Sequence, residues 1–346
     1  MSIRSPRGLA VVAGVAALAG LAPLALSTEP AATSQTGPGV QLLDDARRAA
    51  QEQDFSGVLE VTWSDASGEH SSDVFVRSAN GVLALGDRPR VIVEGARRFV
   101  QGPEGWLAVW SQEAAPDVPP ASDKWVLSVR DGPTVAGRPT REVDATDRHD
   151  DRVRERLYLD ESTSLLLRRE QLDTRGRTVR AVGFTSIGAP DGAFLGAIPA
   201  EAPRAPARST SRQPRVRQQV STPFRAPRTA GDRFQLAGRY DEGHDTLHLF
   251  YSDGLFSVSV FEQEGDLDPT GLPAGAEPRT VEGRDVRQYH TPGGVVMVWQ
   301  SGDVVYTTVS DAPVDQIDDV LADFGPSGSP NALDRVTDFV LGPFSW

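Results

Sequence analysis

The sequence contains no cysteine among its 346 residues. This absence excludes disulfide bonds, a thiol nucleophile, thiolate metal sites and lipid attachment through cysteine, so stability must come from packed cores. The chain also lacks a net positive charge: 48 Asp and Glu outnumber 35 Lys and Arg, so the formal net charge is -13 and the pI is near 4.9. Contacts to nucleic-acid phosphates need a clustered basic face, so the composition argues against nucleic acid as a partner.

Histidine is scarce, with five residues, and none of them completes a recognisable catalytic motif. His244 and His248 have the spacing of the zinc-protease H-E-x-x-H motif, with Asp in place of Glu, but that motif works only on a helix. Residues Thr246–Tyr251 are predicted to form a strand, in which positions four apart lie about 13 Å from each other, too far for one metal ion. His149 lies in a charged segment predicted to be a solvated loop. No serine-hydrolase elbow or phosphate-binding glycine loop follows a strand, so we predict no enzyme, no metal site and no cofactor.

The N-terminus has the pattern of an export signal. Arg4 and Arg7 precede an apolar run from Leu9 to Leu26, and Ala25-Leu26-Ser27 resembles a small-x-small cleavage site. An uncleaved signal anchor is the alternative, because the run is nearly long enough to span a bilayer. In either case the rest of the chain is predicted to be exported, to the periplasm or the extracytoplasmic face of the cell membrane.

Composition and periodicity divide the chain into successive segments. We predict a signal peptide or anchor (1–27), a flexible spacer (28–38), an N-terminal domain (39–198), a Pro/Arg-rich linker (199–229), a C-terminal domain (230–325) and a tail (326–346). The linker is interpreted as a solvated spacer, with contact to anionic lipid head groups or a cell-wall polymer as the alternative.

The predicted N-terminal domain begins with a helix and continues as antiparallel strands. Apolar residues from Val40 to Ala50 recur at helical spacing, and from Phe55 to Trp63 they alternate with period two. Short strands separated by turn clusters follow as far as Ile187, and the proline-containing stretch Gln112–Asp123 is predicted to be an exposed loop. The predicted C-terminal domain has strands between Phe234 and Val309 and a helix at Val314–Leu321. The predicted fold class is therefore α+β, mainly antiparallel β.

Apolar and aromatic side chains on the predicted curved sheet suggest a groove for an acyl chain, because one helix covers little of such a sheet. A simple core beneath the helix and loops is the alternative for each of them. The predicted groove residues are Leu59, Val61, Trp63, Phe75, Trp106, Trp110 and Tyr158. In the C-terminal domain we predict partner contacts at Tyr251, Phe256 and Phe261.

Two motifs carry a family resemblance. Ala136-Gly137-Arg138 followed by residues 156–168, RLYLDESTSLLLR, resembles the AGR and LWLDxxTGLLL runs of the MucB/RseB sigma-E regulatory proteins. Residues 252–262, SDGLFSVSVFE, are similar to the SDGLAxxSVFIE strand pair of the same family. Ser164 departs from the family pattern, because it stands where a turn glycine is expected.

The resemblance implies a LolA-like half-barrel around a helix, followed by a smaller C-terminal domain that helps bind the outer part of a membrane anti-sigma factor. It further implies that such a protein shields the anti-sigma factor from proteolysis in envelope stress and that a lipid or acyl ligand releases it. A homodimer is left open. The alternative function is that of a LolA-like lipid or lipoprotein carrier, and an exported enzyme ranks third.

Overall fold

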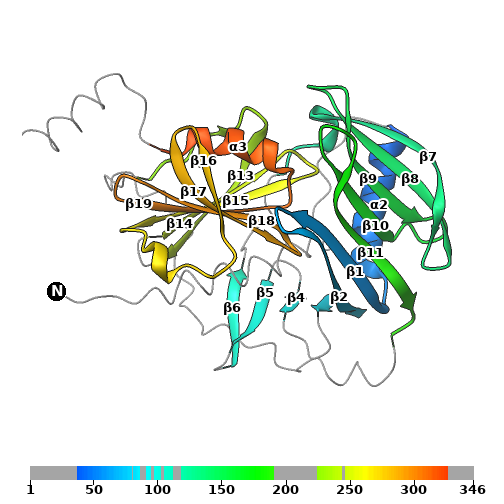
Figure 1. The fold of residues 1–346 in the computed structure, drawn as a ribbon. Helices are drawn as coiled ribbons and strands as arrows, with labels where there is room; N and C mark the ends of the chain where they lie inside the picture. Colours follow the sequence, from blue (N-terminus) through cyan, green and yellow to red (C-terminus); the bar gives the residue numbers. More distant parts are fainter. Residues whose placement is uncertain are drawn as a thin grey trace, which may run out of the picture.

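The structure of the chain is a computed structural model. It describes residues 37–79, 81–85, 91–94, 97–102, 105–111, 118–190, 224–243 and 246–325. Side chains are not described for 91–94, 97–102, 105–111, 122 and 241–243. The predicted signal segment, most of the spacer, the linker up to residue 223 and nearly all of the tail lie outside these residues. Two antiparallel sheets and two helices make up the described part (Figure 1).

Helix α2 (Pro38–Glu52) forms where the apolar spacing predicts it. Pro38 occupies the first turn, where its missing N–H is not needed. Leu43 and Ala46 lie on its buried face and pack against Leu157 and Leu159 of the sheet. The helix is thereby held against the sheet by apolar contact.

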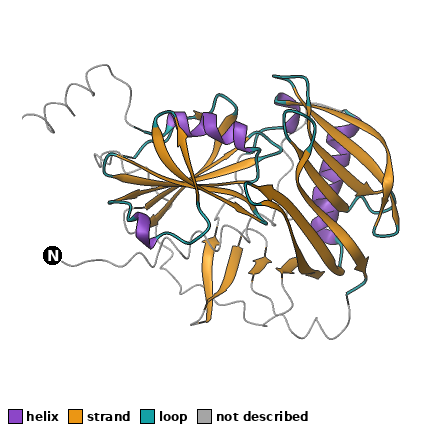
Figure 2. Cartoon of the chain, viewed as in Figure 1, coloured by secondary structure: helices purple, strands orange, loops and turns teal. Residues whose placement is uncertain are grey.

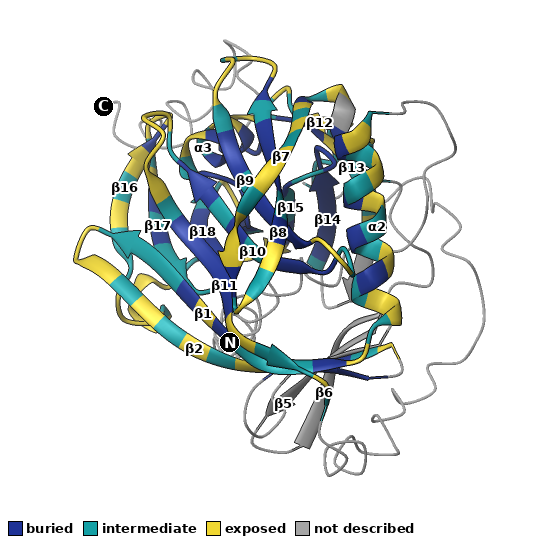
Figure 3. Cartoon of the chain, turned by 90° about the vertical axis from the view of Figure 1, so that its right-hand side faces the viewer, coloured by how far each residue is buried: buried dark blue, intermediate teal, exposed yellow. Residues whose placement is uncertain are grey.

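The first sheet has eleven strands in the order β6-β5-β4-β3-β2-β1-β11-β10-β9-β8-β7. Two meanders are joined in this order by the antiparallel pair β1–β11, and the sheet curves around α2 (Figure 2). The strands are β1 (Phe55–Asp65), β2 (Gly68–Ala79), β3 (Val82–Leu85), β4 (Val91–Glu94), β5 (Arg97–Gly102), β6 (Gly105–Ser111), β7 (Trp125–Val135), β8 (Arg138–Asp147), β9 (Val153–Asp160), β10 (Leu166–Leu172) and β11 (Thr178–Gly188), with the short helix η2 (Ala121–Asp123) before β7. We call these elements the N-terminal unit. Exposed positions recur along β2 and β7 (Figure 3).

The second sheet has eight strands in the order β12-β13-β14-β15-β19-β18-β17-β16. They are β12 (Thr229–Ala230), β13 (Phe234–Gly243), β14 (Thr246–Ser252), β15 (Ser257–Glu264), β16 (Glu277–Val281), β17 (Arg284–Thr291), β18 (Gly294–Ser301) and β19 (Val304–Ser310), with η3 (Pro269–Gly271) and helix α3 (Val314–Asp323). Helix α3 packs on one face of this sheet through Ile317, Val320 and Leu321. We call these elements the C-terminal unit.

The predicted fold class, α+β with mainly antiparallel β, is confirmed, as is a curved sheet around one helix. Three strands were not predicted: β8, β16 and the two-residue β12, which falls where the predicted linker ends. β8 contains Glu142 and Asp144 between its apolar residues, and β16 contains Pro278. Proline is tolerated in β16 because that strand lies at the edge of its sheet.

No helix in the described ranges is both long and apolar enough to cross a membrane.

Candidate functional site: the seam between the two units

Three arginines lie where the two units meet, and each binds one carboxylate of its own unit and one of the other. We call this cluster the seam. It consists of Arg154, Arg169 and Arg233 with Asp147, Asp150, Glu155, Asp253, Asp311 and Asp315.

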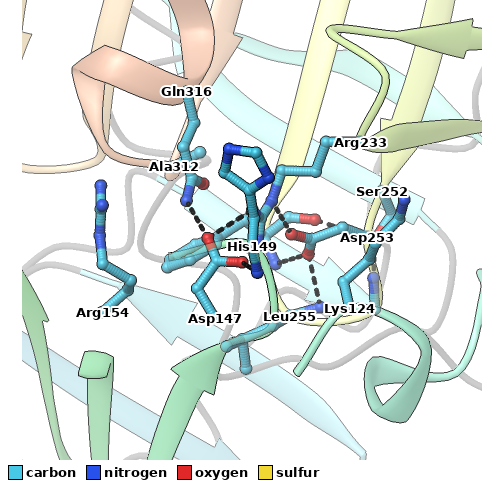
Figure 4. Close-up of polar contacts among 12 residues, drawn as sticks. Lys124, Asp147, His149, Arg154, Arg233, Ser252, Asp253, Leu255, Ala312 and Gln316 are labelled. Carbon is cyan, nitrogen blue, oxygen red and sulfur yellow. Dashed lines mark hydrogen bonds and ion pairs between the residues drawn. The ribbon is translucent and has the colours of Figure 1, made fainter. Parts of the chain in front are cut away.

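Arg233, in the turn between β12 and β13, joins the ends of two distant strands (Figure 4). Its Nε donates to Asp253 Oδ2 at 2.7 Å, and its Nη1 donates to Asp147 Oδ2 at 2.6 Å. The guanidinium carbon lies 4.4 Å from the ring centre of Trp125, a cation–π arrangement. Gln316 of α3 also donates to Asp147 Oδ2, at 3.4 Å. The side chain of Arg233 is thus fixed by both units.

Asp253 shows why the sequence forms this site at a turn. Its Oδ1 accepts the backbone N–H groups of Leu255 and Phe256 at 3.0 and 2.8 Å, which is the usual use of Asp in a turn. The residue is fully buried, and burial raises the pKa of its carboxyl above the ordinary value despite the opposing effect of Arg233.

Arg169 on β10 makes the second link. It binds Glu155 of β9 through both Nε and Nη2, and its Nη1 donates to Asp311 Oδ2 at 2.9 Å. Asp311 follows β19 and also accepts the N–H of Ser257 at 2.7 Å through Oδ1. Gln171 donates to the carbonyl of Asp311 at 2.6 Å. Because Glu155 is fully buried, this link lies inside the molecule.

Arg154 on β9 makes the third link, with its side chain 2% exposed. Nη1 donates to Asp150 Oδ2 at 3.0 Å, and Nη2 donates to Asp315 Oδ1 at 2.8 Å. Asp315 occupies the first turn of α3, where a carboxylate is favoured by the helix dipole. Burial alone would lower the pKa of Arg154, but Asp315 and Asp150 outweigh it and raise the pKa.

Apolar packing accompanies these ion pairs. Trp125 of β7 is buried within the hydrophobic cluster of the C-terminal unit and meets Phe256 edge to face at 5.4 Å. Gly254, at φ +89°, lies against the N-terminal unit: a Cβ atom there would stand 2.5 Å from the Pro119 carbonyl oxygen and 2.4 Å from Ala121 N. The prediction that Gln112–Asp123 is an exposed loop is therefore wrong for Ala121, which is buried because the β14–β15 turn covers it.

The seam fixes the relative placement of the two units. A buried ion pair is weak evidence for net stability, because desolvation offsets much of the attraction. Removing one partner, however, strands a buried charge and costs about 3–5 kcal/mol. A displaced unit would break three links at once, two of them between buried partners and the third between buried Arg154 and half-exposed Asp315, so the arrangement seen here is favoured over neighbouring ones.

The predicted groove residues are only partly brought together. Leu59, Val61 and Tyr158 are buried in one hydrophobic cluster, and Trp63 lies half-buried at its margin, stacked on His70 at 5.3 Å. The Tyr158 hydroxyl donates to Glu170 Oε2 at 3.1 Å, and burial together with Glu170 raises the pKa of Tyr158 to about 12. These residues lie together in one hydrophobic cluster of the described structure, and their role in lipid binding remains a prediction.

Phe75 lies apart from that cluster. It pairs across the ladder with Val58, whose neighbour Leu59 is in the core, so alternation puts Phe75 on the opposite face of the sheet. Its exposed fraction is 40%. Trp106 and Trp110 fall on β6, where the side chains are outside the described residues.

The predicted partner contacts in the C-terminal unit fall into two groups. Tyr251 and Phe256 are buried in its core, so neither presents a surface in this arrangement. Phe261 is half-buried on β15 and stacks on His248 at 4.3 Å. A contact between any of the three and a partner remains a prediction.

The histidine pattern gives no metal site in the described residues, which contain no group of three or more His, Asp or Glu able to hold an ion. His248 lies on a strand, as predicted, while His244 lies outside the described residues. The charged turn at His149–Asp151 does more than the predicted solvated loop, because Asp150 binds the buried Arg154.

A known protein family matches part of the chain. The model of the MucB/RseB N-terminal domain matches residues 76–207 of this chain. The predicted resemblance to the MucB/RseB family is confirmed for these residues, and the second motif, at residues 252–262, lies outside the match. The match begins within β2 and runs through the rest of the N-terminal sheet, so it includes the seam residues Arg154 and Arg169 and leaves the C-terminal unit unmatched.

Solved structures of MucB are also similar to this chain. The complex of MucA and MucB from Pseudomonas aeruginosa is 20% identical, with 82% of this chain and 97% of that chain covered and a TM-score of 0.45. A crystal structure of MucB in complex with MucA(peri) is 18% identical, covering 82% and 96% with a TM-score of 0.43. The LolA superfamily protein NE2245 from Nitrosomonas europaea is 10% identical, covering 80% and 92% with a TM-score of 0.20. No curated protein matches the sequence.

Proposed function

We propose that this chain is an extracytoplasmic, non-enzymatic regulator that binds the outer part of a membrane anti-sigma factor. The match of its N-terminal unit to the MucB/RseB family is the observation that supports this function most directly. MucB itself is known in complex with MucA. The export signal expected from Arg4 to Ser27 agrees with a site of action outside the cytoplasmic membrane.

The seam supports a partner surface shared by both units. Arg154, Arg169 and Arg233 hold the N-terminal sheet and α3 in one arrangement, so side chains at the border of the units keep fixed mutual positions. Fixed positions lower the ordering cost of binding. A partner seated across the border would contact both units without first having to align them.

Regulation of proteolysis and response to a lipid or acyl ligand are part of the same proposal. A bound protein shields its partner from a protease for as long as the complex persists. A ligand can end that protection only by binding the released form more tightly than the complex, because an equilibrium shifts by differential affinity. The apolar cluster that contains Leu59 and Val61 is the proposed place for such a ligand, with Trp63 at its margin.

A pull-down tests the proposal. The mature protein, Thr28–Trp346, is incubated with detergent-solubilised membranes of its own host, and bound proteins and lipids are identified by mass spectrometry. Recovery of a single-pass anti-sigma factor supports the proposed function. Recovery of lipid or lipoprotein without that partner would replace it with the carrier function.

A further inference from the structure

A carboxylate lies in the apolar core of the C-terminal unit. Glu262 of β15 is fully buried, and across the sheet it pairs with Leu247 on one side and Tyr306 on the other. Tyr306 in turn pairs with Trp299, and the two rings stack at 5.1 Å. Paired residues share a face of the sheet, so Glu262 stands in a row of large buried side chains beneath α3.

One hydrogen bond ties this carboxylate to the segment that enters the C-terminal unit from the linker. We call Phe224–Arg228 the entry segment. The backbone N–H of Arg225 donates to Glu262 Oε2 at 2.8 Å, whereas Oε1 is buried and has no hydrogen-bond partner. A buried carboxylate oxygen without a donor is costly when the group is ionised.

The entry segment is otherwise held by neutral contacts. Phe224 and Ala226 pack against the hydrophobic cluster, and the Tyr251 hydroxyl donates to the Pro227 carbonyl at 2.9 Å. The N–H of Leu236 donates to the Arg228 carbonyl at 2.9 Å. Glu262 is thus the one titrating carboxyl that accepts a hydrogen bond from this segment among the described residues.

We propose that Glu262 is a proton-dependent anchor of the entry segment, which holds the segment on the core while its carboxyl is neutral and releases it when the carboxyl ionises. The ionised carboxylate is stabilised when water reaches Oε1. Water reaches it when the entry segment moves away, because this segment lies over Glu262 and is bonded to it through the Arg225 N–H.

The charged and titratable groups around Glu262 set the direction of the effect. Burial raises the pKa of Glu262 to about 7, and the hydrogen bond from the Arg225 backbone N–H, together with the charges of Arg239 and Arg225, opposes that rise only in part. Tyr251 and Tyr306 flank the carboxylate as neutral phenols, because burial and Glu262 raise the pKa of both. The charge of Asp323 adds to the rise in the pKa of Tyr251, whereas the charge of Arg284 opposes the rise in the pKa of Tyr306.

The sign follows from linkage. A carboxyl whose pKa is higher in the closed state than in the open state favours closure at low pH. That contribution is complete below the ordinary value of 4.5 and is lost as the pH rises through about 7. With a Glu262 pKa of about 7 in the closed state and the ordinary value of 4.5 in the open state, the equilibrium constant for opening of the entry segment is about tenfold larger at pH 8 than at pH 6.

Hydrogen exchange of the full-length protein measures this opening. After correction for the pH dependence of intrinsic exchange, the protection factor of the Arg225 and Leu236 amides should fall about tenfold between pH 6 and pH 8. Glu262→Gln should remove the change and keep the protection seen at pH 6. Glu264→Gln is the matched control, since Glu264 lies two positions further along the same strand and is exposed; it should keep the change.

Protection that is equal at the two pH values in the unaltered protein would overturn the proposal, as would a pH dependence that survives Glu262→Gln. If Glu262→Gln does not fold, the carboxyl carbon of Glu262 can be titrated by NMR in the unaltered protein. A midpoint near 7 is expected, and a midpoint near 4.5 would overturn the proposal.

Discussion

Arg169 and Glu155 occupy strand positions at which the alternation calls for apolar side chains. Glu155 is two residues before Leu157, which packs on α2, so it faces the same side of the sheet. The sequence contains this signal, because a charged residue in phase with a buried face must be paired or exposed. The second partner of Arg169, Asp311, could not be predicted, because it lies 142 positions further along the chain.

Replacing Arg169 with Leu should destabilise the protein strongly. The change leaves Glu155 and Asp311 buried without their cation, at a cost of about 3–5 kcal/mol in the free energy of unfolding. Urea denaturation followed by circular dichroism measures the loss. Arg168→Leu is the matched control, because Arg168 is next in sequence, 39% exposed and paired with Glu170; it should cost under 1 kcal/mol. Equal losses for the two variants would contradict the role of the seam.

At the scale of elements, the β14–β15 turn is where the two units come closest. An Asp-Gly pair such as Asp253-Gly254 is typical of a turn, but the second role of this turn, against Pro119 and Ala121, depends on a contact distant in sequence. Helices α2 and α3 were predictable because each carries one apolar stripe. β8 was not predictable, because Glu142 and Asp144 stand among its buried positions and interrupt the apolar alternation. Their partners, Arg130 and Arg156, come from the neighbouring strands.

Gly254→Ala separates the contact from the backbone conformation. The added Cβ would overlap Pro119 and Ala121, so the turn must move away from the N-terminal unit. Gly275→Ala is the control, since Gly275 has a similar φ of +91° and open space around it. Both variants lose about 1 kcal/mol through the left-handed conformation, and Gly254→Ala should lose a further 1–3 kcal/mol through the overlap.

Thermal unfolding measured by calorimetry decides between these outcomes. We expect a larger drop in Tm for Gly254→Ala than for Gly275→Ala. The same drop in both would mean that the close approach of the turn to Ala121 contributes nothing.

At the scale of the whole molecule, the two sheets act as one body because the seam joins them and because Ala121, Trp125 and Ala145 of the N-terminal unit belong to the hydrophobic cluster of the C-terminal unit. The family resemblance of the N-terminal unit was accessible from the sequence, since hairpin motifs and turns are local. The seam was not, because its links join residues 86 to 161 positions apart. Leu59, Val61 and Tyr158 could be placed on apolar strand faces from the sequence, but that they share one buried cluster depends on strand pairing that the sequence does not reveal.

The most direct test of the proposed function is a calorimetric titration of the mature protein with the purified outer segment of its host's single-pass anti-sigma factor. We expect saturable binding that is weakened at least tenfold by Arg233→Leu, which frees the C-terminal unit from Asp147, and that is unchanged by Arg168→Leu. Near-ultraviolet circular dichroism confirms that each variant is folded. Absence of saturable binding by the unaltered protein would contradict the account.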